Sequence, residues 1–181
     1  MLPVAYGGES VLLTIGDGDA RRTALWEPGT DQVSGELSGF TDVLGGGPDE
    51  GSSTGRAAVS VADATCRQQI VRLSNGMPSW DLCREHFVGF SPDGETVLAT
   101  NATSDALIVH DADDGEIEQE FRAPHGLRAY GWESADTVLY TTLDGNSTVV
   151  IRCGLPSGDC LTAATFPDTT SIPQPVARYG D

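Results

Sequence analysis

The feature that most constrains the fold is the stretch HFVGFSPDGETVLAT, residues 86–100. A short apolar run at 87–90 is followed by the turn residues Ser91-Pro92-Asp93-Gly94 and then by a second apolar run at 96–100. Pro, Asp and Gly supply the backbone angles that a tight turn requires. This stretch therefore predicts two short strands joined by a turn.

Two more strands complete this unit, and the whole unit recurs along the chain. We expect these strands at 105–110, in the run DALIVHD, and at 116–121, joined by the Ala112-Asp113-Asp114-Gly115 turn. Looser copies of the unit begin near residues 2, 41, 87 and 128, so the repeat is about forty residues long. A four-stranded unit of this length is typical of a β-propeller blade.

The predicted fold class is all-β, because no segment shows a sustained helical period of apolar residues. We expect a β-propeller-like array of about four four-stranded antiparallel blades, as half of a larger propeller. The remaining strands are expected at 2–6, 10–15, 22–26 and 33–37, at 41–44, 56–62, 66–73 and 79–83, and at 128–132, 137–142, 148–153 and 160–166. The blades are then bounded near 1–40, 41–85, 86–124 and 125–166, with a low-complexity loop at 45–55 and an irregular tail at 167–181.

Four blades in an open arc leave a sheet face and strand edges exposed at each end. Three arrangements remove this exposure. The chain can be part of a larger propeller, two copies can pair into an eight-bladed ring, or one chain can close on itself. We expect the first arrangement in the natural protein and a homodimer when the chain is isolated.

The charge balance restricts the partners. The chain has 27 acidic residues and ten basic ones, all of them Arg, which gives a formal net charge of −17. Such a surface repels phosphate backbones and anionic lipids, so we expect neither nucleic-acid binding nor binding to a membrane surface. No apolar run is long enough to span a bilayer. Met1 leads directly into an expected strand, and no signal peptide is recognised.

The four cysteines fall into two close pairs. Cys66 and Cys83 flank one expected hairpin, whose midpoint is the Asn75 turn, and Cys153 and Cys160 flank another. Residues facing each other at a non-hydrogen-bonded antiparallel pair lie within disulfide range. We therefore predict the bridges Cys66–Cys83 and Cys153–Cys160. A four-thiolate zinc site would need shorter Cys-to-Cys spacings, and a cytosolic protein with four free thiols is the other alternative.

Several polar residues are of types that can bind metal ions or act in catalysis. The acidic run HDADDGEIE, residues 110–118, departs from the calcium-hand pattern and is read as a hairpin turn, so no metal site and no cofactor are predicted. His110 alternates with apolar neighbours and is expected to be a packed core residue. No Gly-x-Ser-x-Gly elbow occurs, and without Lys there is no phosphate-binding loop with its lysine. The tryptophans fall on expected strands, where core packing is favoured over ligand stacking.

The FSPDGETVLAT unit, the hairpin LIVHDADDGEIEQEF and the four-fold spacing resemble the WD-repeat and TolB-like β-propellers of bacteria. The Trp-Asp dipeptide that ends a standard WD-repeat strand is absent there, because Trp80-Asp81 lies elsewhere in its unit. The cysteine-bridged form is similar to exported propellers attached to membrane anchors in Gram-positive bacteria. The resemblance implies an extracellular or cell-surface domain of an exported or membrane-anchored protein, of which this sequence is a piece.

The resemblance also implies where ligands bind. Propeller ligands usually meet the loops that join the second strand to the third and the fourth strand to the next blade. In this sequence those loops carry the candidate binding residues Asp17, Asp19, Glu85, His86, Asn101, Asp105, His125 and Asp144.

The function implied is a non-catalytic extracytoplasmic module that acts as a binding or protein-interaction scaffold. Its expected partners are a protein or a small-molecule ligand at the rim, together with the remaining blades of the parent protein or a second copy of the chain. The alternative is half of a propeller enzyme, a glycan lyase or hydrolase with its site in the axial channel. A third reading is a regulatory sensor ectodomain.

Overall fold

The computed structural model describes residues 3–7, 10–15, 22–27, 29–30, 32–37, 40–46, 55–61, 65–72 and 76–167. In this part of the chain every regular element is a β-strand. The described residues contain no helix of the length and apolar character needed to cross a membrane.

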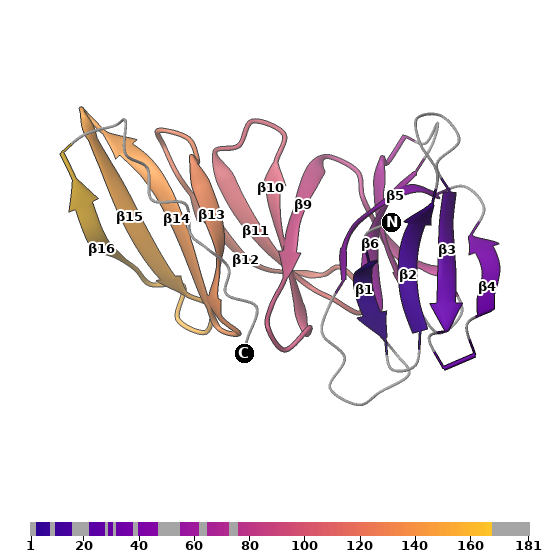
Figure 1. Cartoon of the computed structure of the whole chain (residues 1–181). Helices are drawn as coiled ribbons and strands as arrows, with labels where there is room; N and C mark the ends of the chain where they lie inside the picture. The colour runs from indigo at the N-terminus through magenta and orange to yellow at the C-terminus, as the bar shows by residue number, and fades with distance from the viewer. Residues whose placement is uncertain are drawn as a thin grey trace.

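Sixteen strands form four antiparallel sheets of four strands each, and each sheet follows the order of the chain (Figure 1). The first sheet holds β1 (Pro3–Gly7), β2 (Ser10–Ile15), β3 (Arg22–Glu27) and β4 (Gln32–Leu37). The second holds β5 (Phe40–Gly46), β6 (Arg56–Val61), β7 (Gln68–Arg72) and β8 (Pro78–Leu82). The third holds β9 (Glu85–Phe90), β10 (Thr96–Asn101), β11 (Ala106–Asp111) and β12 (Ile117–Arg122). The fourth holds β13 (Ala129–Ser134), β14 (Thr137–Asp144), β15 (Ser147–Gly154) and β16 (Cys160–Phe166).

This arrangement confirms the predicted all-β fold class, and the expected strands are all present with ends that shift by a few residues. One shift of two residues lies in the second sheet, where Cys66 was expected to open a strand and Cys83 to close one. Both cysteines lie just outside the ladder, whose last pair is Gln68 with Leu82. The bridge between them ties the two chain segments together beyond the point where the strand pairing ends.

The turn that identified the repeat has the predicted form. The N–H of Gly94 donates to the carbonyl of Ser91 at 2.9 Å, and Gly94 has a φ of 77°. The Ser91 hydroxyl donates to a carboxylate oxygen of Asp93 at 2.5 Å. A side chain with a β-carbon disfavours this left-handed φ, so the Gly in the SPDG turn is a steric requirement.

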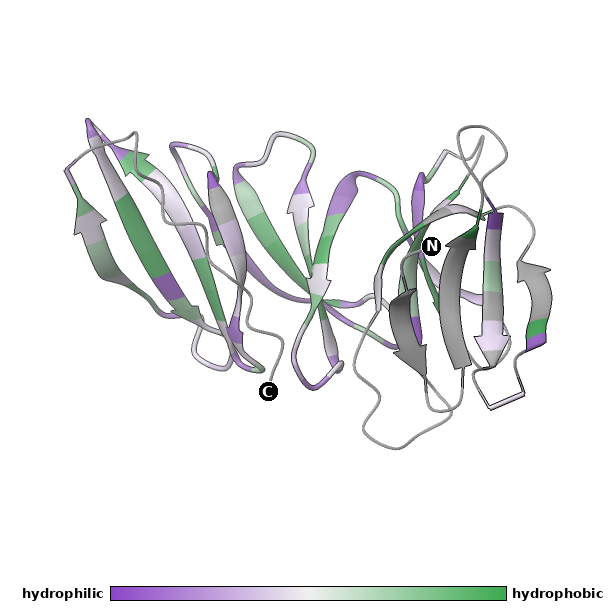
Figure 2. Ribbon diagram, viewed as in Figure 1, coloured by the Kyte–Doolittle hydropathy of each residue, from purple (hydrophilic) through white to green (hydrophobic). Residues whose placement is uncertain are grey.

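The sheets stand in a row and pack face to face (Figure 1). Their first strands are neighbours in space, because β5 packs on β1, β9 on β5 and β13 on β9. Figure 2 shows apolar residues along the central strands β11 and β15. In the third sheet, β10 and β11 are buried on both faces, as expected for strand sequences with no strict polar alternation.

Two apolar cores fill the gaps on either side of the third sheet. The core toward the second sheet comprises Ala58, Ile70, Leu82, Phe90, Val97, Ala99 and Ala112. The core toward the fourth sheet comprises Leu98, Leu107, Val109, Phe121, Ala123, Leu127, Val138, Tyr140 and Cys153. Side chains alternate along each strand, so neighbouring residues such as Val97 and Leu98 enter different cores.

Tryptophan side chains connect adjacent sheets. The indole N–H of Trp80, in the second sheet, donates to the carbonyl of Ala112 at 3.1 Å. The indole N–H of Trp132, in the fourth sheet, donates to the carbonyl of Gly89 at 3.2 Å. A β-carbon at Gly115, where φ is 79°, would lie 2.6 Å from the Trp80 ring, so this position requires Gly on two grounds. Trp80 and Trp132 thus act in packing, as the sequence predicted.

Candidate functional site

A cavity of about 780 Å³ lies at one rim, between the second and third sheets. The second sheet contributes the start of β5, the end of β6 and the start of β7, and the third contributes the start of β9 and Ala102. The link between β8 and β9 completes the wall. Two of these segments, the start of β9 with the link before it and the turn after β10, are among those in which the sequence placed candidate ligand residues. Glu85 and His86, two of those candidates, both line the cavity.

Glu85 is held in place by a buried histidine. A carboxylate oxygen of Glu85 lies 2.7 Å from Nε2 of His110, and Nδ1 of His110 lies 3.0 Å from the carbonyl oxygen of Gly115. His110 is 4% exposed, and its ring packs on Trp80 with 5.2 Å between ring centroids. His110 is therefore the packed core residue that the sequence predicted. It fixes Glu85 at the boundary between the rim cavity and the core.

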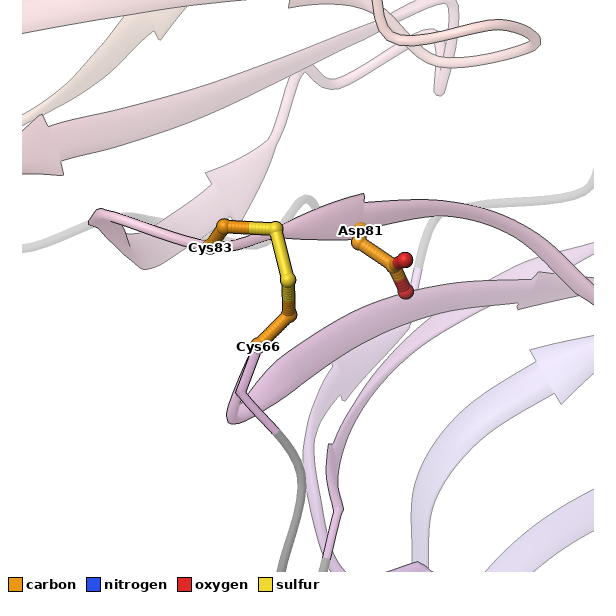
Figure 3. A group of neighbouring side chains, drawn as sticks. All are labelled: Cys66, Asp81 and Cys83. Atoms are coloured by element: carbon orange, nitrogen blue, oxygen red, sulfur yellow. A yellow bond between two sulfur atoms is a disulfide. The ribbon is translucent and has the colours of Figure 1, made fainter.

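A disulfide forms part of the cavity wall. Cys66 and Cys83 are bridged with their α-carbons 3.9 Å apart, and Cys83 lines the cavity. Figure 3 shows Asp81 beside the bridge. The sulfur atoms and the Asp81 carboxylate lie within 4.8 Å of one another, as in a metal site. Because the two sulfurs are bonded to each other and Asp81 accepts a hydrogen bond from the Gln69 amide at 2.6 Å, this cluster offers no thiolate ligand.

The second disulfide lies within a ladder. Cys153 and Cys160 are directly opposite each other on β15 and β16, with α-carbons 4.2 Å apart. The N–H of Gly154 donates to the carbonyl of Asp159 at 3.0 Å, which makes the adjacent cysteine pair a non-hydrogen-bonded one. Both predicted bridges are present, and no cysteine is free.

Asn101 and Asp105 lie together in the turn between β10 and β11. The Asn101 amide donates to the Asp105 carboxylate, and Oδ1 of Asn101 accepts the backbone N–H groups of Asp105 and Ala106 at 3.0 and 3.2 Å. Hydrogen bonds from Asn101 and then Thr103 lower the pKa of Asp105. These two side chains therefore build the turn that carries Ala102 to the cavity.

His125 and Asp144 lie farther along the same rim. The segment that carries His125 is hydrogen-bonded to the turn between β10 and β11, because the N–H of Leu127 donates to the carbonyl of Ser104 at 2.7 Å. The Thr142 hydroxyl, near Asp144, donates to the carbonyl of Gly126 at 2.9 Å. His125 and Asp144 are exposed, and neither lines the cavity. Asp17 and Asp19 lie outside the described residues.

The acidic hairpin at residues 111–116 is a turn stabilised by its own carboxylates. A carboxylate oxygen of Asp111 accepts the N–H of Asp113 at 2.6 Å, and one of Asp114 accepts the N–H of Glu116 at 2.9 Å. The N–H of Gly115 donates to the carbonyl of Asp111 at 3.0 Å and closes the loop. These bonds agree with the reading of this segment as a hairpin turn.

Sequence reasoning missed the basic part of the cavity. Arg67 and Arg84 line it, together with Gln68, and both arginines are exposed. The signal was present in the sequence, because each arginine directly follows a cysteine of the same predicted bridge. The bridge itself therefore places Arg67 and Arg84 near each other.

The sequence matches no known family model and no curated protein. Its fold, however, is similar to that of the β-propeller domain of Cps50 (Swd1) from Myceliophteria thermophila, with a TM-score of 0.59 and 15% identity, over 93% of this chain and 59% of that one. Hydrazine synthase from Kuenenia stuttgartiensis has a TM-score of 0.56 and 15% identity, over 91% of this chain and 48% of that one. The chain thus spans about three fifths and about half of these two chains. The likeness concerns the fold alone, which is a partial β-propeller.

Proposed function

We propose that this chain is a non-catalytic binding module, a partial propeller that holds a protein or small-molecule ligand at its rim. The observation that carries the proposal is the cavity between the second and third sheets. Its volume falls in the range of small-molecule sites, and it lies among the loops where propellers bind their ligands. Rigid sheets position these loops from both sides, which is how scaffold proteins present binding surfaces.

The lining of the cavity favours binding over hydrolysis. Glycoside hydrolysis ordinarily uses two carboxylic acids that flank the scissile bond. Glu85 is the single carboxylate among the described residues that line the cavity, and His110 engages one of its oxygens. The proposed role therefore involves recognition rather than bond cleavage.

The disulfides support an extracytoplasmic location. Both bridges persist in an oxidising compartment, whereas cytosolic thiols are kept reduced. Together with the SPDG turn, they support the proposal that the chain is the cell-surface part of an exported or membrane-anchored bacterial protein similar to the TolB-like propellers. We divide it into blades at 1–40, 41–85, 86–124 and 125–166, followed by a tail at 167–181.

The outward face of the fourth sheet is the open end of the blade array. Val138 and Cys153 point toward the third sheet, so the residues next to them, Leu139 and Arg152, point away from it. Leu161 lies opposite Arg152 and shares the outward face, where it is 57% exposed. In the proposed function, the remaining blades of the parent protein cover this face. A second copy covers it when the chain is isolated.

Sedimentation equilibrium under oxidising conditions, over a range of concentrations, tests ring completion. We expect a concentration-dependent rise from 19.0 kDa toward twice that mass, because two four-bladed arcs complete one ring. A chain that remains at 19.0 kDa throughout and binds no hydrophobic dye would contradict the proposed open end.

A further inference from the structure

The rim cavity concentrates positive charge in a strongly acidic protein. Arg67 and Arg84 both line it and are exposed, although the chain carries a net charge of −17. Other arginines form ion pairs with acidic residues: Arg56 pairs with Asp113, Arg122 with Glu120 and Arg152 with Glu133. Among the described residues, no carboxylate forms an ion pair with Arg67 or Arg84.

The Cys66–Cys83 disulfide sets the spacing of the two arginines. Arg67 follows Cys66 and Arg84 follows Cys83, and the α-carbons of the bridged cysteines are 3.9 Å apart. Since consecutive α-carbons are about 3.8 Å apart, those of Arg67 and Arg84 can be separated by at most about 12 Å. Two long side chains at this separation can reach one ligand in the cavity.

The neutral polar groups of the cavity add donors. Oε1 of Gln68 accepts the backbone N–H of Phe87 at 2.7 Å, which fixes the side-chain amide and leaves its NH₂ group as the available end. Among the described residues of the lining, Glu85 is the one carboxylate, and one of its oxygens is already bonded to His110. Donors therefore outnumber acceptors, which is the composition of an anion site.

We propose that this cavity binds a ligand bearing two or more carboxylates, held by the guanidinium groups of Arg67 and Arg84. A guanidinium presents parallel N–H groups whose geometry matches a carboxylate, and charged hydrogen bonds of this kind are about twice as strong as neutral ones. Gln68 donates a further hydrogen bond from its oriented amide. The inference rests on the rim-binding part of the proposed function and names the chemistry of the ligand.

Calorimetric titration of the oxidised chain with glutarate tests the proposal, with glutaramide as the uncharged analogue of equal shape. We expect saturable binding of glutarate that weakens as salt is raised, and none of glutaramide. A Gly-Glu-Glu-Glu peptide forms a second arm. Tighter binding of this peptide than of glutarate would identify the natural ligand as an acidic protein segment. Tighter binding of glutarate than of the peptide would identify it as a small acid. Inorganic phosphate as tight as glutarate contradicts selectivity for carboxylates.

The double variant Arg67→Gln/Arg84→Gln should weaken glutarate binding roughly tenfold or more, because two charged hydrogen-bond donors are lost. Arg72→Gln/Arg128→Gln is the matched control. These two arginines are also exposed and lie outside the cavity lining, so the same loss of charge should change binding less than about twofold. Equal weakening in both double variants would show a general charge effect and overturn the proposal.

Two further variants keep the result interpretable. Arg84→Lys retains the charge and loses the planar fork, so binding should fall between that of the unmodified chain and the double variant. Cys66→Ser/Cys83→Ser removes the link that fixes the arginine spacing and should also weaken binding. Circular dichroism establishes that each variant is folded. A folded chain that rises in mass as expected but does not bind glutarate refutes this inference and leaves ring completion standing.

Discussion

The third and fourth sheets carry the same pattern of strand pairing but differ on the face directed toward the end of the array. Leu98 pairs with Gly89 and Val109 in the third sheet, and Leu139 pairs with Gly131 and Arg152 in the fourth. Val109 is fully buried, whereas the Arg152 side chain is 46% exposed and pairs with Glu133.

The two glycines show the same difference. The carbonyl of Gly89 accepts the Trp132 indole N–H, and a β-carbon at Gly89 would touch that ring at 4.0 Å. A β-carbon at Gly131 would meet no atom within 4 Å. The outward face of the fourth sheet therefore corresponds to the face of the third sheet that packs on its neighbour, but no sheet covers it. The Arg152–Glu133 ion pair lies where the third sheet has the buried Val109. A polar outer face is also what terminal units of repeat proteins require for solubility.

The largest expected effect comes from making the third sheet resemble the fourth. Val109→Arg would place a charge in a closed apolar core with no carboxylate prepared for it. We expect a loss of about 4 kcal/mol or more in the free energy of unfolding, measured by urea denaturation. A loss below about 1 kcal/mol would show that the two sheets are not packed as described.

The disulfide on the packed side of the fourth sheet has the next largest effect. Cys153→Ala/Cys160→Ala opens a link between residues 7 apart, for which loop closure predicts a loss of about 2 kcal/mol in the free energy of unfolding. Because Cys153 is fully buried in the core toward the third sheet, lost packing adds to this value. Urea denaturation of the oxidised double variant provides the measurement, and an unchanged midpoint would contradict a structural role.

Making the outward face of the fourth sheet resemble the third sheet should have a small effect on the stability of the monomer. Arg152→Val removes a partly exposed ion pair, so the unfolding free energy of the monomer should change by less than about 1 kcal/mol. It also removes the cost of desolvating the Arg152 guanidinium in any contact made by this face, while the Glu133 carboxylate stays in water. Sedimentation should therefore show stronger pairing of copies, and weaker pairing would mean that Arg152 makes a contact across the interface.

The smallest effect concerns the turns that precede the second strands of the two sheets. The Ser134 hydroxyl donates to Asp136 at 2.7 Å, as Ser91 donates to Asp93 in the third sheet. The hydrogen bonds from Ser134 and then Thr137 lower the pKa of Asp136. A carboxyl whose pKa is lowered by folding stabilises the fold above its unfolded pKa, near 3.9, and this contribution is lost as pH falls through the folded value.

Ser134→Ala should accordingly raise the pKa of Asp136 toward its ordinary value, as measured by NMR titration of the carboxyl carbon. The variant should also weaken the dependence of stability on pH below about pH 4. A pKa that does not move in Ser134→Ala would show that the hydroxyl is not the main cause of the shift.

Sequence reasoning succeeded where the interactions are local. The SPDG turn, the hairpin at residues 111–116 and both disulfides join residues that are close in sequence, so turn chemistry and strand alternation were sufficient to predict them. The buried His110 was also predicted from alternation within one strand.

The rim cavity and the ion pair of the open face depend on how sheets stack. The predicted bridge brings Arg67 and Arg84 near each other, but the two arginines line a cavity only because the second sheet packs on the third, which no turn or period encodes. The pairing of Arg152 with Glu133 joins residues on β15 and β13 that a third strand separates. Such contacts are set by packing between elements, and a single sequence does not reveal them.

The most direct test of the account is whether the outward face of the fourth sheet is the face that pairs. Leu161→Glu places a charge on that face. Ile117→Glu is the control, because Ile117 is equally exposed, at 57%, but is the first residue of β12 in the third sheet. In sedimentation equilibrium, we expect Leu161→Glu to remain at 19.0 kDa and Ile117→Glu to pair as the unmodified chain does. Equal masses for the two variants would contradict this expectation.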